Sequence, residues 1–102
     1  MEAGKLALLL DRCETTAQIL KALAHPQRLE ILCHLTDGEK SVGDLEQLCG
    51  ASQSAVSQFL ARMKAEGLVA ARRDDRYVLY KIADPKIFQL IEALHRIYCP
   101  SR

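Results

Sequence analysis

Residues 41–68 constrain the fold most, because they predict two short amphipathic helices with only a tight turn between them. Apolar residues in the first helix recur at the spacing that gives one buried face. Gly50 lies between the two helices, where a turn requires a positive φ. Ser52 then stands where the N-cap of the second helix is expected. This order predicts a helix-turn-helix over about residues 41–67. The first helix is expected around Val42 to Leu48, with Val42, Leu45 and Leu48 buried.

The second helix of this pair has two contrasting faces. Its apolar residues recur at i, i+3, i+4 and i+7, which predicts a stripe buried in the core. The opposite face carries short hydrogen-bonding side chains and one cation, and such groups bond phosphate oxygens and base edges in a DNA major groove. We therefore expect a DNA-reading surface here. The core stripe comprises Val56, Phe59, Leu60 and Met63, and the candidate DNA-binding residues are Ser52, Gln53, Ser54, Ser57, Gln58 and Arg62.

The chain changes from helical to strand periodicity after Gly67, which is placed to end the helix as a C′ residue. Two strand-like runs over residues 68–82 surround a short charged turn, and this pattern predicts a β-hairpin. A hairpin that follows a recognition helix is a wing, whose cations can reach the DNA backbone or a minor groove. An ordinary solvated hairpin is the alternative interpretation. The candidate DNA-binding cations of the wing are Arg72, Arg73 and Arg76.

Helices are predicted on both sides of this unit. One is expected over Asp11 to Ala24, and a second from Pro26, which suits a first helical turn, to about Thr36. Asp84-Pro85 is expected to cap a last helix over about residues 84–98. The apolar residues of that helix cover more surface than one core contact requires, which indicates a dimer interface shared with the N-terminal helix. We predict a single domain over residues 1–102, mainly α with a small β-hairpin, of the winged helix-turn-helix class.

Composition excludes several classes of protein. A chain of 102 residues with a net charge of +1 can build a core but is not of the strongly basic type that coats nucleic acid without discrimination. No apolar stretch is long enough to span a bilayer, and the N-terminal segment is too soon charged for a signal peptide, so we expect a cytoplasmic protein with no membrane partner. No nucleophile has a convincing base and orienting group, and no Gly-rich loop cradles phosphates, which argues against an enzyme and predicts no cofactor.

The four cysteines lack CxxC spacing and lie in segments that read as helices, so they predict no disulfide scaffold. Their spacing also supplies no local set of soft metal ligands, and we expect no metal site. An isolated helical cysteine is most often a small buried hydrophobe, and we keep that interpretation for Cys13 and Cys49. The histidines are expected as caps, surface residues or packed residues rather than ligands.

Four segments together carry a family resemblance over nearly the full chain. They are ALAHPQRLEIL, SVGDLEQL, SQSAVSQFLARMKAEGLV and RYVLYKI, and they resemble the ArsR/SmtB family of winged-helix repressors. The resemblance implies a homodimer that binds double-stranded operator DNA with inverted-repeat symmetry and releases it when an inducer is sensed. Such dimers place their two recognition helices about one DNA turn apart, roughly 34 Å.

The sensing residues follow from the resemblance only where the motifs match. Thiol-rich metal sensors of the family have Cys-x-Cys where this chain has residues 41–45, and zinc sensors have a His where this chain has Lys86. A subgroup of dithiol sensors similar to HlyU, BigR and SqrR fits better, because Cys33 and Cys99 match its two cysteine positions. The resemblance implies that sulfane sulfur or an oxidant links Cys33 to Cys99 within one subunit and weakens DNA binding.

The positions of these two cysteines within their predicted helices lower the reactivity expected of their thiols. Cys33 and Cys99 both lie near predicted helix C-termini, where the helix dipole opposes an anion. A direct disulfide requires Cα atoms about 4.4–6.8 Å apart, so a wider gap would favour inserted sulfur atoms. Two alternatives stay open: a repressor that responds to a thiophilic metal ion or arsenite, and a winged helix used only for protein interaction. Cations that would favour the thiolates are Arg28, His34, His95, Arg96 and Arg102.

Overall fold

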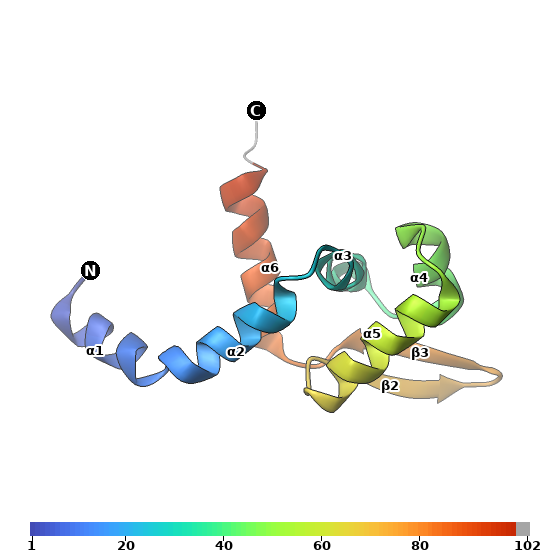
Figure 1. Ribbon diagram of the computed structural model, residues 1–102, viewed down its shortest axis with the longest axis horizontal. Coiled ribbons are helices and arrows are strands. Elements are labelled where there is room, and N and C mark those ends of the chain that lie inside the picture. The colour runs from blue at the N-terminus through green and yellow to red at the C-terminus, as the bar shows by residue number, and fades with distance from the viewer. Residues whose placement is uncertain (100–102) are drawn as a thin grey trace.

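The structure is a computed structural model that describes residues 1–99 of the chain (Figure 1). The order of its helices and strands is that of a winged helix-turn-helix, with α-helices before and after the strands of the wing. The helices are α1 (Ala3–Asp11), α2 (Cys13–Leu23), α3 (Pro26–His34), α4 (Val42–Cys49), α5 (Gln53–Ala65) and α6 (Pro85–Tyr98), with a short 3-10 turn over Leu35–Asp37. The strands are β1 (Lys40–Ser41), β2 (Val69–Asp74) and β3 (Tyr77–Ile82).

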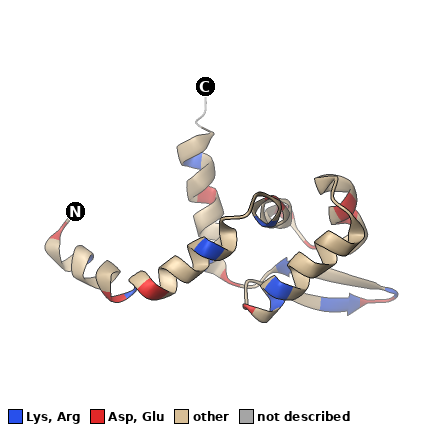
Figure 2. Ribbon diagram, viewed as in Figure 1, with Lys and Arg blue, Asp and Glu red and all other residues tan. Residues whose placement is uncertain are grey.

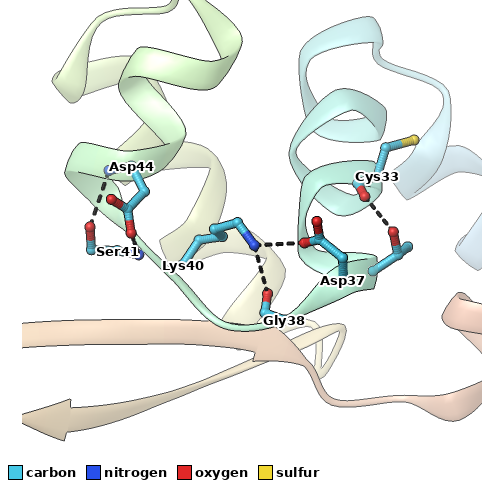
Figure 3. Close-up of polar contacts among 7 residues, drawn as sticks. Cys33, Asp37, Gly38, Lys40, Ser41 and Asp44 are labelled. Carbon is cyan, nitrogen blue, oxygen red and sulfur yellow. Dashed lines mark hydrogen bonds and ion pairs between the residues drawn. The ribbon is translucent and has the colours of Figure 1, made fainter.

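Local capping fixes the bounds of the helix-turn-helix. The Ser41 hydroxyl accepts a hydrogen bond from the Asp44 amide at 3.1 Å, and the Asp44 carboxylate accepts one from the Ser41 amide at 3.0 Å (Figure 3). Gly50 ends α4 in the left-handed region with φ 65°, and the Ser52 hydroxyl caps α5. Gly67, with φ 79°, turns the chain from α5 into the wing. The predicted turn, N-cap and helix end are confirmed.

The sheet is antiparallel and has three strands in the order β1-β3-β2. The wing pairs Val69 with Ile82 at its base and Asp74 with Tyr77 at its tip. Asp75 adopts φ 58° in the turn, a conformation that Asp tolerates better than most residues. The predicted hairpin is therefore present, and the two-residue strand β1, which pairs with β3, adds to it. This strand joins the first turn of the helix-turn-helix to the wing.

One apolar core lies where helices α2 to α6 and the base of the wing meet. Leu45 and the α5 residues Val56, Leu60 and Met63 are completely buried. The predicted core is wrong at Leu48, and Val42 and Phe59 pack against the core but are only partly buried. Leu48 is 48% exposed, and Phe59 is only partly buried, because its ring packs beside the His25 ring at the core's edge, 4.8 Å between centroids.

The N-terminal helical region differs from the prediction. A separate helix, α1, precedes the expected helix, with the break at Arg12. No residue of α1 is buried, and Figure 1 shows α1 projecting from the body of the molecule, as does the far end of α6. Leu8 and Leu10 on α1 are 57% and 61% exposed, and Ile97 on α6 is 65% exposed. These two arms present apolar surface with no cover from the rest of the described chain.

None of the helices over residues 1–99 combines the length and the apolar character that a bilayer crossing requires.

Candidate nucleic-acid interface and cysteine pocket

The outer face of α5 presents the polar residues that the sequence predicts as DNA contacts. All six, from Ser52 to Arg62, are exposed, whereas the opposite stripe is held in the core. Ser52 accepts a hydrogen bond from the Ala55 amide at 3.1 Å, so its oxygen already serves as the helix cap. Within residues 1–99 no hydrogen bond joins the side chains of Gln53, Ser57 or Gln58 to another protein group. Their amides and hydroxyls are free to bond a ligand.

The wing arginines are not equivalent. Arg72 donates two hydrogen bonds to the Glu39 carboxylate, Nε to Oε2 at 2.7 Å and Nη2 to Oε1 at 2.8 Å. Arg73 and Arg76 are exposed and have no ion-pair partner in the part of the chain that the structure describes. Figure 2 shows basic residues along the wing, at its tip and near the C-terminal end of α5. The wing and α5 thus form one positively biased surface on a nearly neutral chain.

The N-terminus of α3 supports the recognition helix. His25 caps α3 by accepting a hydrogen bond from the Gln27 amide at 3.2 Å, as expected of a capping histidine. The Arg28 guanidinium lies 5.9 Å from the Phe59 ring centroid and 3.7 Å from the Glu66 carboxylate. These contacts hold the middle and the C-terminal end of α5 against α3.

Cys33 and Cys99, which are 66 positions apart in the sequence, line one pocket between α3 and α6. Both thiols are free and accessible to solvent. Cys33 is the penultimate residue of α3, and Cys99 is the C-cap of α6, so both lie at helix C-termini as predicted. The pocket is lined largely by apolar residues from the two helices, including Leu29, Phe88 and Ile91.

The charges around Cys33 disfavour its thiolate. Partial burial, the Glu30 carboxylate one turn earlier and the neighbouring Cys99 thiol together raise the pKa of Cys33. Two of the cations expected to help are occupied elsewhere: Arg28 pairs with Glu66, and His34 lies 3.5 Å from Glu30. His95 and Arg96 do line the pocket, while Arg102 lies outside the described residues. Moderate thiol reactivity is the expected result.

A further cluster of possible ligand side chains was not recognised from the sequence. One ligand atom each from Glu30, His34 and Cys49 lies within 4.8 Å of the others. Glu30 and His34 are one turn apart on α3, whereas Cys49 ends α4. The i, i+4 spacing on α3 was a visible signal, but the third residue comes close only through packing of the two helices. Cys13, in contrast, is exposed rather than a small buried hydrophobe.

Comparison with known proteins supports the protein class indicated by the winged helix-turn-helix fold and by the positively biased surface of α5 and the wing. Residues 25–71 match the model of the bacterial regulatory proteins of the arsR family. The chain is 43% identical over 97 residues to the HTH-type transcriptional regulator YgaV of Escherichia coli (strain K12), with 94% of this chain and 98% of the relative covered. The protein is a winged helix-turn-helix transcriptional regulator, not an enzyme. It belongs to the arsR family.

Solved structures agree in fold over most of the chain. The transcriptional repressor BigR from Xylella fastidiosa is similar with a TM-score of 0.87 and 37% identity, covering 99% of this chain and 100% of that one. Reduced HlyU from Vibrio cholerae N16961 has a TM-score of 0.83 at 41% identity, covering 89% and 96%. The homodimeric winged helix-turn-helix domain of Mb0332 from Mycobacterium bovis has a TM-score of 0.75 at 32% identity, covering 96% and 87%.

Proposed function

We propose that this regulator is a homodimeric repressor whose operator binding is relieved when reactive sulfur species or oxidants link Cys33 to Cys99. The observation that carries this proposal is that the two thiols line the same pocket, although they are 66 positions apart in the sequence. A pocket that is mostly apolar suits an uncharged sulfur ligand better than a charged metal complex. A repressor and a protein solved in a reduced state are among the similar structures, which is consistent with this reading.

When a persulfide is the sulfur donor, the reaction that links Cys33 to Cys99 requires no other oxidant. Each cysteine thiolate attacks the sulfane sulfur of a persulfide RSSH, takes up that sulfur and releases the thiol RSH. Condensation of the two cysteine persulfides then forms a trisulfide between Cys33 and Cys99 and expels H₂S. With hydrogen peroxide, one thiol is oxidised to a sulfenic acid, and attack by the other thiol forms a disulfide and water. The raised pKa of Cys33 slows both routes at neutral pH and favours the stronger electrophile.

The link acts on DNA through the dimer interface. Exposed apolar residues on α1 and α6 fit a second copy of the chain, because together they would otherwise leave a large apolar surface in water. A covalent bond between α3 and α6 changes how α6 sits on the body and thereby the separation of the two recognition helices. An inverted-repeat operator requires that separation to be about 34 Å, so a modest shift weakens binding. The apolar residues are Leu6, Leu8, Leu9, Leu10, Phe88, Ile97 and Tyr98.

The DNA contacts we assign in the repressor are those exposed on α5 and the wing. Ser54, Ser57 and the two glutamines of α5 face the major groove, while Arg62, Arg73 and Arg76 contact phosphates. Ser52 and Arg72 contribute less, because one caps α5 and the other pairs with Glu39. Because the proposed ligand is DNA, we propose that the protein acts in the cytoplasm of a bacterial cell.

The proposal is tested by intact-mass analysis and peptide mapping of the reduced protein after exposure to an organic persulfide, peroxide, zinc or arsenite. Operator affinity is measured on each product. We expect a Cys33–Cys99 link, with a mass gain of whole sulfur atoms after persulfide, and weakened DNA binding. The variant Cys13→Ser is a matched control, because Cys13 is an exposed cysteine outside the pocket. Unmodified thiols together with a metal adduct that releases DNA would replace sulfur with a metal as the inducer.

A further inference from the structure

A mixed set of donor atoms lies between α3 and the end of α4. A carboxylate oxygen of Glu30, a ring nitrogen of His34 and the sulfur of Cys49 all lie within 4.8 Å of one another. Glu30 and His34 project from the same face of α3 because they are four residues apart. Cys49 reaches them from α4, immediately before the turn of the helix-turn-helix. The set therefore bridges two helices.

The geometry is close to that of a tetrahedral metal site. Zinc bonds of about 2.0–2.3 Å to oxygen, nitrogen and sulfur require neighbouring ligand atoms roughly 3.3–3.7 Å apart at tetrahedral angles. His34 Nε2 already lies 3.5 Å from Glu30 Oε2. The other separations are no more than 4.8 Å, so they require a closure of at most about 1 Å, which a small side-chain rotation supplies.

An ordinary surface ion pair does not account for the whole set. An exposed i, i+4 pair such as Glu30 and His34 stabilises a helix only weakly. The pair also leaves out Cys49, whose half-buried thiol lies against the same carboxylate: burial, the charge of Glu30 and a hydrogen bond to Glu30 raise the pKa of Cys49. A cation among the three residues would compensate the carboxylate and accept the sulfur as a ligand.

We propose that Glu30, His34 and Cys49 bind a divalent transition-metal ion of the zinc class. Sulfur, imidazole and carboxylate donors together select Zn²⁺ or Co²⁺ over Mg²⁺ and Ca²⁺, which prefer oxygen ligands alone. Three protein ligands leave the fourth tetrahedral position to water. On binding, the Cys49 proton passes to solvent and His34 coordinates as neutral imidazole.

The bound ion ties α3 to the last residue of α4. Gly50 and Ala51 follow directly, and Ser52 then caps the recognition helix α5. Metal binding therefore fixes the start of the turn that orients α5 toward DNA. The site uses neither Cys33 nor Cys99 as a ligand, so its donor set is distinct from the two thiols of the proposed sulfur switch, although Glu30 also lies near Cys33.

Cobalt is the spectroscopic probe, added to the reduced full-length protein. We expect one Co²⁺ per chain, with tetrahedral d–d bands and a thiolate-to-cobalt charge-transfer band that Zn²⁺ bleaches on displacement. The charge-transfer band should persist in the double variant Cys33→Ser, Cys99→Ser and in Cys13→Ser, and disappear in Cys49→Ser. Circular dichroism checks that each variant is folded.

A second pair of variants keeps the test independent of any folding defect at Cys49. Glu30→Gln and His34→Gln change partly exposed side chains, and each should weaken Co²⁺ binding at least about tenfold, as ligand loss does in protein metal sites. No charge-transfer band in the native protein, or a band that follows Cys33 and Cys99 rather than Cys49, overturns the proposal. The first result leaves the sulfur proposal untouched, whereas the second would favour a metal as the inducer, which the zinc and arsenite arms of the persulfide experiment test separately.

Discussion

Arg72 holds Glu39 through two parallel hydrogen bonds of 2.7 and 2.8 Å, a contact that joins strand β2 of the wing to the residue before β1. The two residues are 33 positions apart. The planar guanidinium matches the carboxylate edge, and such paired bonds are the most directional ion-pair geometry available to proteins. The contact therefore fixes the middle of the wing relative to the segment that leads into the helix-turn-helix. It also leaves only Arg73 and Arg76 unpaired among the wing arginines of the described chain.

We expect the three wing arginines to contribute unequally to the salt dependence of operator binding. Arg73→Ala and Arg76→Ala should each lower the slope of log affinity against log salt by about 0.9, because each removes one phosphate contact. Arg72→Ala should lower it less, since Glu39 already neutralises that side chain. Affinity measured over a range of salt concentrations checks this. Equal slopes for all three variants would show that DNA draws Arg72 away from Glu39.

The recognition helix should carry the sequence selectivity. Gln53→Ala and Gln58→Ala each remove a base-edge contact and should cost about 1–3 kcal/mol on the operator but little on unrelated DNA. Arg62→Ala should weaken both kinds of binding alike, because a phosphate contact carries no sequence information. Gln89→Ala, an exposed glutamine on α6, is the matched control. Unchanged affinity in both Gln53→Ala and Arg62→Ala would mean that another face reads DNA.

Single cysteine variants separate binding from sensing. Cys33→Ser and Cys99→Ser should bind the operator as tightly as the native protein, since neither residue lies on the α5 face or the wing. Both should lose the response to persulfide, which in the native protein is expected to reduce affinity roughly 5- to 150-fold, a typical allosteric coupling. Titration of operator DNA before and after persulfide treatment measures both. Weak operator binding by the untreated variants would contradict a purely regulatory role.

The exposed apolar surfaces of α1 and α6 predict that the protein forms a dimer. Ile97→Glu on α6 and Leu10→Glu on α1 place a charge on surfaces that are 65% and 61% exposed in the single chain. If those surfaces meet in a dimer, each change should raise the dimer dissociation constant at least about tenfold, because burying such a side chain contributes about 1.5–3 kcal/mol. Sedimentation equilibrium measures this. Lys5→Glu, an exposed polar position on α1, is the control, and unaltered dimerisation of both apolar variants would relocate the interface.

Acid should loosen the segment that leads into the helix-turn-helix. Hydrogen bonds from Lys40 to Asp37 and from the Ser41 backbone to Asp44 lower the pKa of each carboxyl (Figure 3). Because these folded-state pKa values lie below their ordinary values of about 4, the contribution is present above that pH. It is lost as pH falls through the lowered values, when the carboxylates take up protons.

Comparison with Asp44→Asn tests this dependence. The asparagine oxygen can accept the same hydrogen bond from Ser41 at every pH but carries no charge. The melting temperature of the native protein should therefore exceed that of the variant near neutrality, and the difference should shrink between about pH 5 and pH 3. A difference that stays constant over this range would show that the Asp44 charge contributes nothing to the cap.

Local patterns in the sequence were sufficient for the elements that begin and end through contacts within one turn. Ser41, Gly50, Ser52 and Gly67 bond or turn the backbone a few residues away, so the helix-turn-helix and the start of the wing follow from their spacing. The core stripe of α5 follows for the same reason, apart from Phe59 at its edge. In contrast, no Gly or Pro signals the break between α1 and α2 at Arg12, and that helix boundary was missed.

The fold class and the polar face of α5 follow from patterns in the sequence, and the choice of Cys33 and Cys99 follows from family resemblance. Which side chains meet depends on tertiary packing. It joined Arg72 to Glu39, placed the two cysteines in one pocket and brought Cys49 to Glu30 and His34. The physical reason is range: periodicity and capping act over three or four residues, whereas these contacts depend on how whole helices and strands pack.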